Sequence, residues 1–196
     1  MEDPAPRIAP LEPPYDPDTA AMLAKWMPPG GEVEPLRLFR TFALHPELAA
    51  RMRPLGAAIL AHGTVPPLLR EVMIDRTCAL CGAEYEWGVH AAAFAAAVGL
   101  SEEQLASTAG AGPNDPLWSE QERAVLALAD QLHSSSRVSD ECFAELERHL
   151  TIAQILELVV TAGWYHTISY VIAAARVQPE PWARRFPEPR SSLMAE

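Results

Sequence analysis

The sequence predicts an all-α protein built from antiparallel helix pairs. Apolar residues recur at helical spacing along the chain, and even the valine- and isoleucine-rich run 155–160 continues at helical length instead of ending as a strand would. At 196 residues the chain fits one domain, since about 100 to 200 residues is the usual unit. We therefore expect one helical domain over residues 18–178, between a proline-rich N-terminal arm, 1–17, and a loose proline-rich C-terminal tail, 179–196.

Prolines and glycines set the expected helix ends in the first third of the chain. A short helix is expected over residues 18–27, because its first residues are capping types and the prolines and glycines at 28–31 stop it. A second short helix is expected over 36–44. The third runs over 45–63 and should be kinked or broken at Pro54, which supplies no backbone donor.

The next two helices carry most of the reactive side chains. One is expected over residues 64–81, because two prolines fall in its first turn. If it ran on without a break, Glu71 and Glu86 would lie about 22 Å apart at about 1.5 Å per residue and could not share a site. Gly82 is the natural end of this helix, since glycine accepts left-handed backbone geometry. A turn there begins a new helix over 83–98 and folds Glu71 back towards Glu86.

Serine or threonine residues mark the start of each remaining helix, because their hydroxyl oxygens can accept hydrogen bonds from the free backbone N–H groups of the first turn. Gly99 ends the preceding helix. The expected elements are a short helix from 101, a loop over 110–116, and helices over 118–132, 139–149 and 151–177.

The charge and composition exclude several classes of function. The formal net charge is −11 and there is no run of basic residues, which argues against nucleic acid and anionic membrane surfaces. No stretch approaches the ~18 consecutive apolar residues of a membrane span, and the acidic start lacks the features of a signal peptide. We therefore expect a cytoplasmic protein that binds a small-molecule substrate. Schiff-base mechanisms are set aside, because Lys25 is the one lysine and has no other reactive residue near it in sequence.

The stretch 70–90 holds more ionisable and nucleophilic side chains than a structural helix needs. It contains two cysteines, three glutamates, one histidine and two aromatic rings. The run Leu-Cys-Gly-Ala-Glu-Tyr-Glu-Trp-x-x-His within it, with Arg-Glu upstream and Gly-Leu-Ser downstream, resembles the carboxymuconolactone decarboxylase family and the wider superfamily that includes alkylhydroperoxidase D.

The resemblance covers roughly residues 8–180 and implies a helical fold of the alkylhydroperoxidase D type. It also implies a homo-oligomer, commonly a trimer or hexamer. In the peroxidase branch a glutamate, two cysteines and a histidine follow one another at set spacing. In this chain those positions are Glu71, Ala83, Glu86 and His90, so the glutamate and histidine match while other residues replace both cysteines.

Glu86 and His90 are the first candidates for catalysis. They are four residues apart and so share one helical face, where they can hydrogen-bond or share a proton. An exposed surface pair would have the same spacing, but the resemblance favours a functional site. His90 would move a proton, while Glu86 and Glu71 would set its charge and orientation. We expect no metal and no cofactor at this pair, because di-iron bundles use Glu-x-x-His and repeat it on a second helix.

Cys78 and Cys81 form a Cys-x-x-Cys pair, which suits either thiol redox chemistry or a packed core. The pair precedes Gly82 and so lies at a helix C-terminus, where the helix dipole disfavours a thiolate. We expect buried core thiols, with redox use as the alternative.

Further residues are candidates for binding the substrate. Tyr85 and Trp87 flank Glu86, and Arg70 precedes Glu71. His166, behind two aromatic residues, is the histidine among the remaining five that we expect to line a pocket.

Three functional hypotheses follow. The first is a cofactor-free acid/base enzyme, a lyase like carboxymuconolactone decarboxylase, acting on a small carbonyl- or lactone-bearing acid. The second is a thiol-dependent alkylhydroperoxidase that uses Cys78 and Cys81. The third is a non-catalytic oligomeric binding protein.

Overall fold

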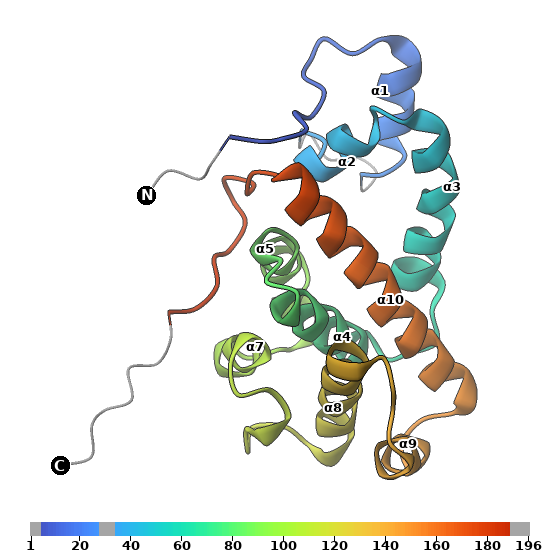
Figure 1. Ribbon diagram of the computed structural model, residues 1–196, viewed down its shortest axis with the longest axis vertical. Helices are drawn as coiled ribbons and strands as arrows, with labels where there is room; N and C mark the ends of the chain where they lie inside the picture. The colour runs from blue at the N-terminus through green and yellow to red at the C-terminus, as the bar shows by residue number, and fades with distance from the viewer. Residues whose placement is uncertain (1–4, 28–33, 189–196) are drawn as a thin grey trace, which may run out of the picture.

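The computed structural model describes residues 5–27 and 34–188, and every regular element in these two ranges is helical. The all-α prediction is therefore confirmed. Figure 1 shows α10, the longest helix, crossing the molecule, with α3 on one side and α4, α5 and α8 on the other. The elements are α1 (Pro17–Ala24), α2 (Arg37–Phe42), α3 (Pro46–Ala57), the π-helix η1 (Ala58–His62), α4 (Pro67–Leu80), α5 (Glu84–Ala93), α6 (Ala95–Val98), α7 (Glu102–Ala109), the 3₁₀-helix η2 (Gly112–Asn114), α8 (Glu120–Ser135), α9 (Asp140–Glu147) and α10 (Ile152–Ala175).

Helices α4 and α10 form the centre of the packing. α4 contacts α5, α7, α8 and α10, and α10 also contacts α5, α8 and α9. By length and composition alone α10 could cross a bilayer, but 44% of its most apolar window is buried inside the protein. The buried face of α10 is accounted for by this packing, because a core helix and a membrane span have similar composition.

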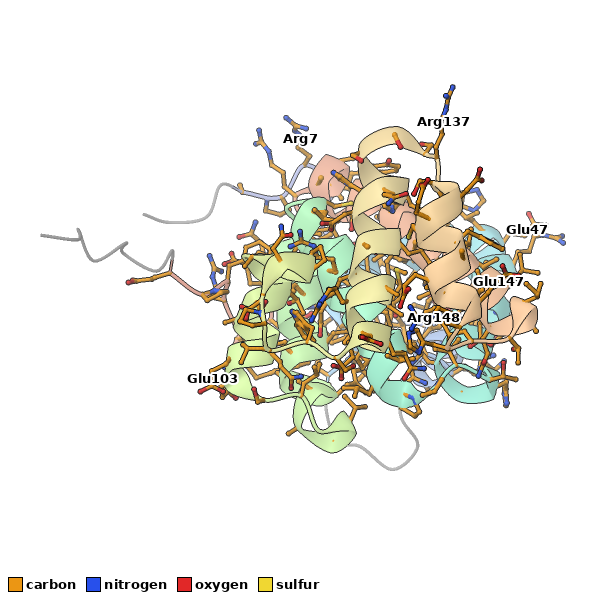
Figure 2. All side chains as sticks on the ribbon, turned by 90° about the horizontal axis from the view of Figure 1, so that it is seen from below. Arg7, Glu47, Glu103, Arg137, Glu147 and Arg148 are labelled. Atoms are coloured by element: carbon orange, nitrogen blue, oxygen red, sulfur yellow. The ribbon has the colours of Figure 1, made fainter. Side chains whose placement is uncertain are left out.

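The core has two parts. The larger cluster joins α4, α8 and α10 through residues such as Met73, Leu126 and Leu158. The smaller one joins α2, α5 and the end of α10, for example through Phe42 and Ile172. Charged side chains such as Arg7, Glu47, Glu103 and Arg137 project from the surface in Figure 2.

The predicted turn at Gly82 is present and sets the geometry of the site. Gly82 has a φ of +65°, which a residue with a side chain rarely adopts. The Gly82 N–H donates to the Ala79 carbonyl over 3.0 Å, and the Ala83 N–H donates to the Cys78 carbonyl over 2.9 Å. These bonds satisfy carbonyls that the end of α4 leaves free. The chain then reverses into α5, which packs along α4.

Two helices differ from their predicted course. α3 continues through Pro54 and then changes to the π-helix η1 at Ala58. Proline removes one helical hydrogen bond and its ring crowds the preceding turn, so the helix adjusts its winding nearby instead of ending. The helix expected over 83–98 is interrupted at Phe94, whose φ of −123° separates α5 from α6.

The two ends of the described chain lie on the domain. In the arm, the N–H groups of Arg7 and Ile8 both donate to the carbonyl of Ala175 at the end of α10. Asp16, and not the predicted residues 18 and 19, caps α1. The glycine- and proline-rich segment 28–31, expected to stop that helix, lies outside the described residues.

The loose tail that we expected is wrong for residues 179–188. The Arg184 N–H donates to the Gly88 carbonyl over 3.1 Å, and a Cβ on Gly88 would lie 2.0 Å from the Arg184 carbonyl oxygen. Only glycine lets the tail approach α5 this closely. The Phe186 ring also packs against Trp87, with ring centres 5.3 Å apart. Proline content indicated an extended segment but not the surface that holds it.

Candidate active site

The turn at Gly82 brings Glu71 of α4 against His90 of α5. His90 Nδ1 lies 2.7 Å from Glu71 Oε2, and both side chains are buried. Because an ionised carboxylate can only accept, Nδ1 carries the proton and donates it. The second oxygen of Glu71 accepts from Arg70 Nε over 3.1 Å, and Arg70 also donates to the Leu60 carbonyl over 3.0 Å. Glu71 is therefore held on both sides and fixes the tautomer and orientation of the imidazole.

The other nitrogen of His90 lies near side chains of two helices. Its Nε2 lies 3.0 Å from the hydroxyl oxygen of Tyr165, on α10, and 3.7 Å from Glu86 Oε1, one turn earlier on α5. The Tyr165 ring meets the imidazole edge-on, with ring centres 5.1 Å apart. Three helices thus contribute to one cluster.

Neighbouring carboxylates control the charge of His90. Burial lowers its pKa, but the charges of Glu71, Glu86 and Asp75 and the hydrogen bond that His90 donates to Glu71 outweigh burial and raise the pKa to about 8. At neutral pH the imidazole is therefore present in both protonation states, as a group that gives and takes protons requires.

The pKa values of the three carboxyl groups around His90 are shifted in different directions. Burial raises the pKa of Glu71, but the positive charge and hydrogen bonds of His90 and Arg70 prevail and lower it. Burial raises the pKa of Glu86, and the positive charge of His90 offsets this rise only in part. Burial also places the pKa of Asp75 well above its ordinary value, and neither of its oxygens has a hydrogen-bond partner among the described residues. The surroundings of Glu71 thus favour its ionised form, while burial opposes the ionised forms of Glu86 and Asp75.

A cavity of about 600 Å³ opens beside this cluster. His90, Glu86 and Tyr165 reach it, and the rest of its wall is largely apolar. Two cationic residues, Lys25 and Arg53, also line it, and Arg53 Nε donates to the Lys25 carbonyl over 2.8 Å. The aromatic rings around the cavity belong to Trp26, Phe39, Phe94, Trp164 and Trp182.

The predicted binding residues lie elsewhere. The Tyr85 hydroxyl accepts from the Leu38 N–H and donates to Glu180, and Trp87 Nε1 donates to Thr108 Oγ1 over 3.0 Å. Both aromatic side chains are buried by packing and do not line the cavity. Flanking positions on a helix point in other directions, so adjacency to Glu86 does not bring them to the same space.

Arg70 and His166 also lie outside the cavity lining. Arg70 bonds Glu71, and so acts on the site through that carboxylate. His166 follows Tyr165 in sequence but is turned about 100° away around α10, and its Nδ1 donates to the Ala162 carbonyl. The expectation that His166 lines the pocket is wrong.

The two cysteines have environments that disfavour thiolates. Cys78 is fully buried, and burial together with the charges of Glu86 and Asp75 raises its pKa well above the ordinary value. Cys81 is half-buried, and burial raises its pKa as well. Neither lines the cavity.

Three residues of the site were not predicted from the sequence. Tyr165 lies 75 positions from His90, and Arg53 comes from α3. Asp75 is one turn from Glu71 on the same face of α4, so helical spacing alone could have found it.

Solved structures share this fold over most of their length. An uncharacterized peroxidase-related protein from Silicibacter sp. TM1040 has a TM-score of 0.77 at 16% identity, covering 95% of this chain and 100% of its own. A cysteine-to-alanine variant of the debrominase Bmp8, in complex with 2,3,4-tribromopyrrole, has a TM-score of 0.75 at 19% identity, covering 92% and 95%. An alkylhydroperoxidase AhpD core protein from Ralstonia eutropha JMP134 has a TM-score of 0.72 at 17% identity, covering 90% and 95%.

At these identities the likeness shows the fold. No protein of curated function matches the chain. Residues 46–131, which contain Glu71, Glu86 and His90, match the model of the Carboxymuconolactone decarboxylase family. This segment of the chain is similar to the carboxymuconolactone decarboxylase family, and the fold of the chain is that of the alkylhydroperoxidase D-like proteins.

Proposed function

We propose that this protein is a cofactor-free acid/base enzyme that moves a proton at carbon next to a carbonyl group, in a small acid or lactone with an apolar body. The observation that carries the proposal is the placement of His90. Its Nδ1 is held by Glu71 over 2.7 Å while its Nε2 faces an apolar cavity beside Tyr165 and Glu86.

The chemistry uses these groups in a simple order. Neutral His90 takes the proton through Nε2, so that the C–H bond breaks and its electron pair moves into the carbonyl as an enolate. Glu71 stabilises the imidazolium that forms. The Tyr165 hydroxyl, whose pKa burial keeps well above the ordinary value, stays protonated and can donate to the enolate oxygen. Return of the proton to another carbon completes an isomerisation. In a decarboxylation the C–C bond to the carboxylate breaks in place of the C–H bond, its electron pair forms the enolate, carbon dioxide leaves, and the His90 imidazolium gives its Nε2 proton to the enolate carbon.

The cavity supports this substrate class. Its wall is mainly aliphatic and aromatic, which favours an apolar body, while Arg53 and Lys25 are the cationic residues among those lining it. In a protein with a net charge of −11, an anionic substrate needs such local positive charge. The guanidinium of Arg53 can bind a carboxylate through two hydrogen bonds.

Thiol-dependent peroxide reduction is the second candidate, supported by the peroxidase-related neighbours. The raised thiol pKa values and the absence of both cysteines from the cavity favour the acid/base hypothesis. The third hypothesis, a binding protein without activity, leaves the buried Glu71–His90 pair without a purpose, since buried ion pairs seldom repay their desolvation in stability.

Deuterium exchange into small keto acids and unsaturated lactone acids, followed by proton NMR in D₂O, tests the proposal. Each acid is paired with its methyl ester. We expect exchange in one or more acids, with Arg53→Gln raising KM for the acid but leaving the ester unaffected.

Arg51→Gln is the matched control, because Arg51 lies on the same helix, is exposed and pairs with Glu47. Absence of exchange across the panel, together with peroxide reduction that depends on the cysteines, would establish the second candidate instead.

A further inference from the structure

A second group of reactive side chains lies away from the cavity. Cys81 caps the end of α4, His133 lies in the last turn of α8, and His166 lies within α10. Cys81 Sγ is 3.8 Å from His133 Nδ1, which is 3.1 Å from His166 Nε2, and one ligand atom from each residue lies within 4.8 Å of the others. None of the three lines the cavity beside His90.

The spacing of these atoms matches the edges of a tetrahedral metal site. Zn–S bonds of about 2.3 Å and Zn–N bonds of about 2.0 Å at tetrahedral angles place sulfur and nitrogen about 3.5 Å apart, and two nitrogens about 3.3 Å apart. The observed 3.8 and 3.1 Å are close to these values. Small side-chain rotations would bring all three atoms to a common ion.

The tautomer of His166 is already that of a metal ligand. Its Nδ1 donates to the carbonyl of Ala162 over 2.8 Å, so in neutral His166 the lone pair is on Nε2, the atom that faces His133. A hydrogen bond of this kind from the second ring nitrogen to a backbone carbonyl is typical of histidines that bind metal.

The local electrostatics favour a cation. The C-terminal ends of α4 and α8, with their partial negative charge, meet at Cys81 and His133. Asp130 and Arg76 also face His133 with opposite charges, but they are bonded to each other over 2.6 Å.

We propose that Cys81, His133 and His166 form a transition-metal site suited to Zn²⁺, with a fourth position open to water. The ion would replace the thiol proton of Cys81 and join three helices. This soft ligand set of one sulfur and two nitrogens fits zinc better than magnesium or calcium, which prefer oxygen. The other cluster of this kind among the described residues, Glu120, Glu145 and His149, is oxygen-rich, and its carboxylates already pair with Arg148.

The test uses the full chain, freed of metal by chelation and dialysis. Zn²⁺ titrated by calorimetry should bind at one equivalent. Co²⁺ in place of zinc should give the intense near-ultraviolet absorption of a thiolate–cobalt bond together with the visible bands of tetrahedral cobalt. Cys81→Ser, His133→Ala and His166→Ala should each weaken Zn²⁺ binding at least about tenfold. Changing a group that only hydrogen-bonds to a metal ligand already weakens binding by about tenfold or more, so the loss of a ligand should cost at least as much.

Cys142→Ser and His62→Ala are the matched controls, since each removes the same type of side chain outside the cluster and should leave binding unchanged. Failure of Zn²⁺ to bind, or equal affinity in Cys81→Ser and the parent, would overturn the proposal. If a ligand variant does not fold, the cobalt spectrum of the parent protein decides, because tetrahedral bands without thiolate absorption would contradict the assignment.

Discussion

His90 and Glu71 are nineteen residues apart in the sequence and 2.7 Å apart in the fold, joined through Nδ1 of the imidazole and Oε2 of the carboxylate. The turn at Gly82 makes this contact, and the contact has two consequences. It leaves Nε2 of His90 free to face the cavity, and it raises the pKa of the imidazole.

Glu71→Gln should therefore change the pH dependence of turnover. If neutral His90 is the base, activity in the parent rises with pH through a midpoint near the His90 pKa of about 8. Removing the carboxylate withdraws a negative charge that favours the imidazolium, so the midpoint should move to lower pH and maximal turnover should fall.

The pH–rate profile of Glu145→Gln is the control, because Glu145 also pairs with a histidine, His149, but near the surface. An unchanged midpoint in Glu71→Gln would mean that this carboxylate does not set the charge of His90.

The raised pKa of His90 also predicts a pH-dependent contribution to the free energy of unfolding. The pKa of His90 is about 8 in the folded protein and about 6.5 when unfolded. Because the folded value is higher, the contribution is complete below about pH 6.5 and is lost as pH rises through 8, and it amounts to roughly 2 kcal/mol at most. Urea unfolding at pH 6 and pH 9 measures it. His90→Gln should show a smaller loss of stability between the two pH values than the parent does; equal losses would argue against the shift.

The cysteines should be dispensable for acid/base turnover. Cys78→Ser combined with Cys81→Ser should leave turnover within a few-fold of the parent, because neither thiol lines the cavity. Some stability should be lost, since Cys78 is fully buried and serine places a hydroxyl there. A peroxide-reduction assay with a dithiol donor tests the alternative. Robust activity in the parent that disappears in the double variant would support the alkylhydroperoxidase hypothesis.

We propose that the protein is a homo-oligomer, as the resemblance implies. One face of α10 exposes Ile152, Leu156, Val160 and Tyr170, with Leu156 63% and Tyr170 66% accessible. A row of apolar side chains on a long helix is typical of a surface that another subunit covers. Light scattering at micromolar concentration should give a multiple of 21.4 kDa.

Leu156→Glu should reduce the mass, whereas Leu117→Glu, at an exposed leucine outside this face, should not. A parent mass of one chain would refute the proposal.

Much of the fold follows from local signals. Gly82, Gly99 and the serine and threonine caps of α7 to α10 lie where the sequence predicts helix ends, because capping depends on a few adjacent residues. Pro54 predicted a disturbance of α3, but the π-helix that follows it and the break at Phe94 lie beyond what local signals predict.

The site was predictable only in part for the same reason. Helical spacing and one turn relate Glu71, Glu86 and His90, which lie within twenty residues. Tyr165 and Arg53 join them through tertiary packing, and Cys81, His133 and His166 come from three helices, so no spacing in the sequence relates them. The ordered tail likewise depends on Gly88, which leaves room for the backbone of residue 184. Because these two residues are far apart in the sequence, no local pattern predicts their contact.

We propose that His90 carries the proton and that Glu86 acts with it. His90→Gln is a better test than His90→Ala, because alanine would leave the buried Glu71 carboxylate with Arg70 as its remaining hydrogen-bond partner and so destabilise the fold. His90→Gln should lower turnover by ~10² to 10⁴. Glu86→Gln should have a smaller effect and move the acidic limb of the pH profile downward, since Glu86 also raises the pKa of His90.

The most direct measurement is a double-mutant cycle on turnover with His90→Gln and Glu86→Gln, with circular dichroism as the folding control. We predict that the double variant is scarcely slower than His90→Gln alone, because members of one catalytic unit fail together. Parental turnover in folded His90→Gln would contradict the account, and full additivity of the two effects would show that His90 and Glu86 do not act as a pair.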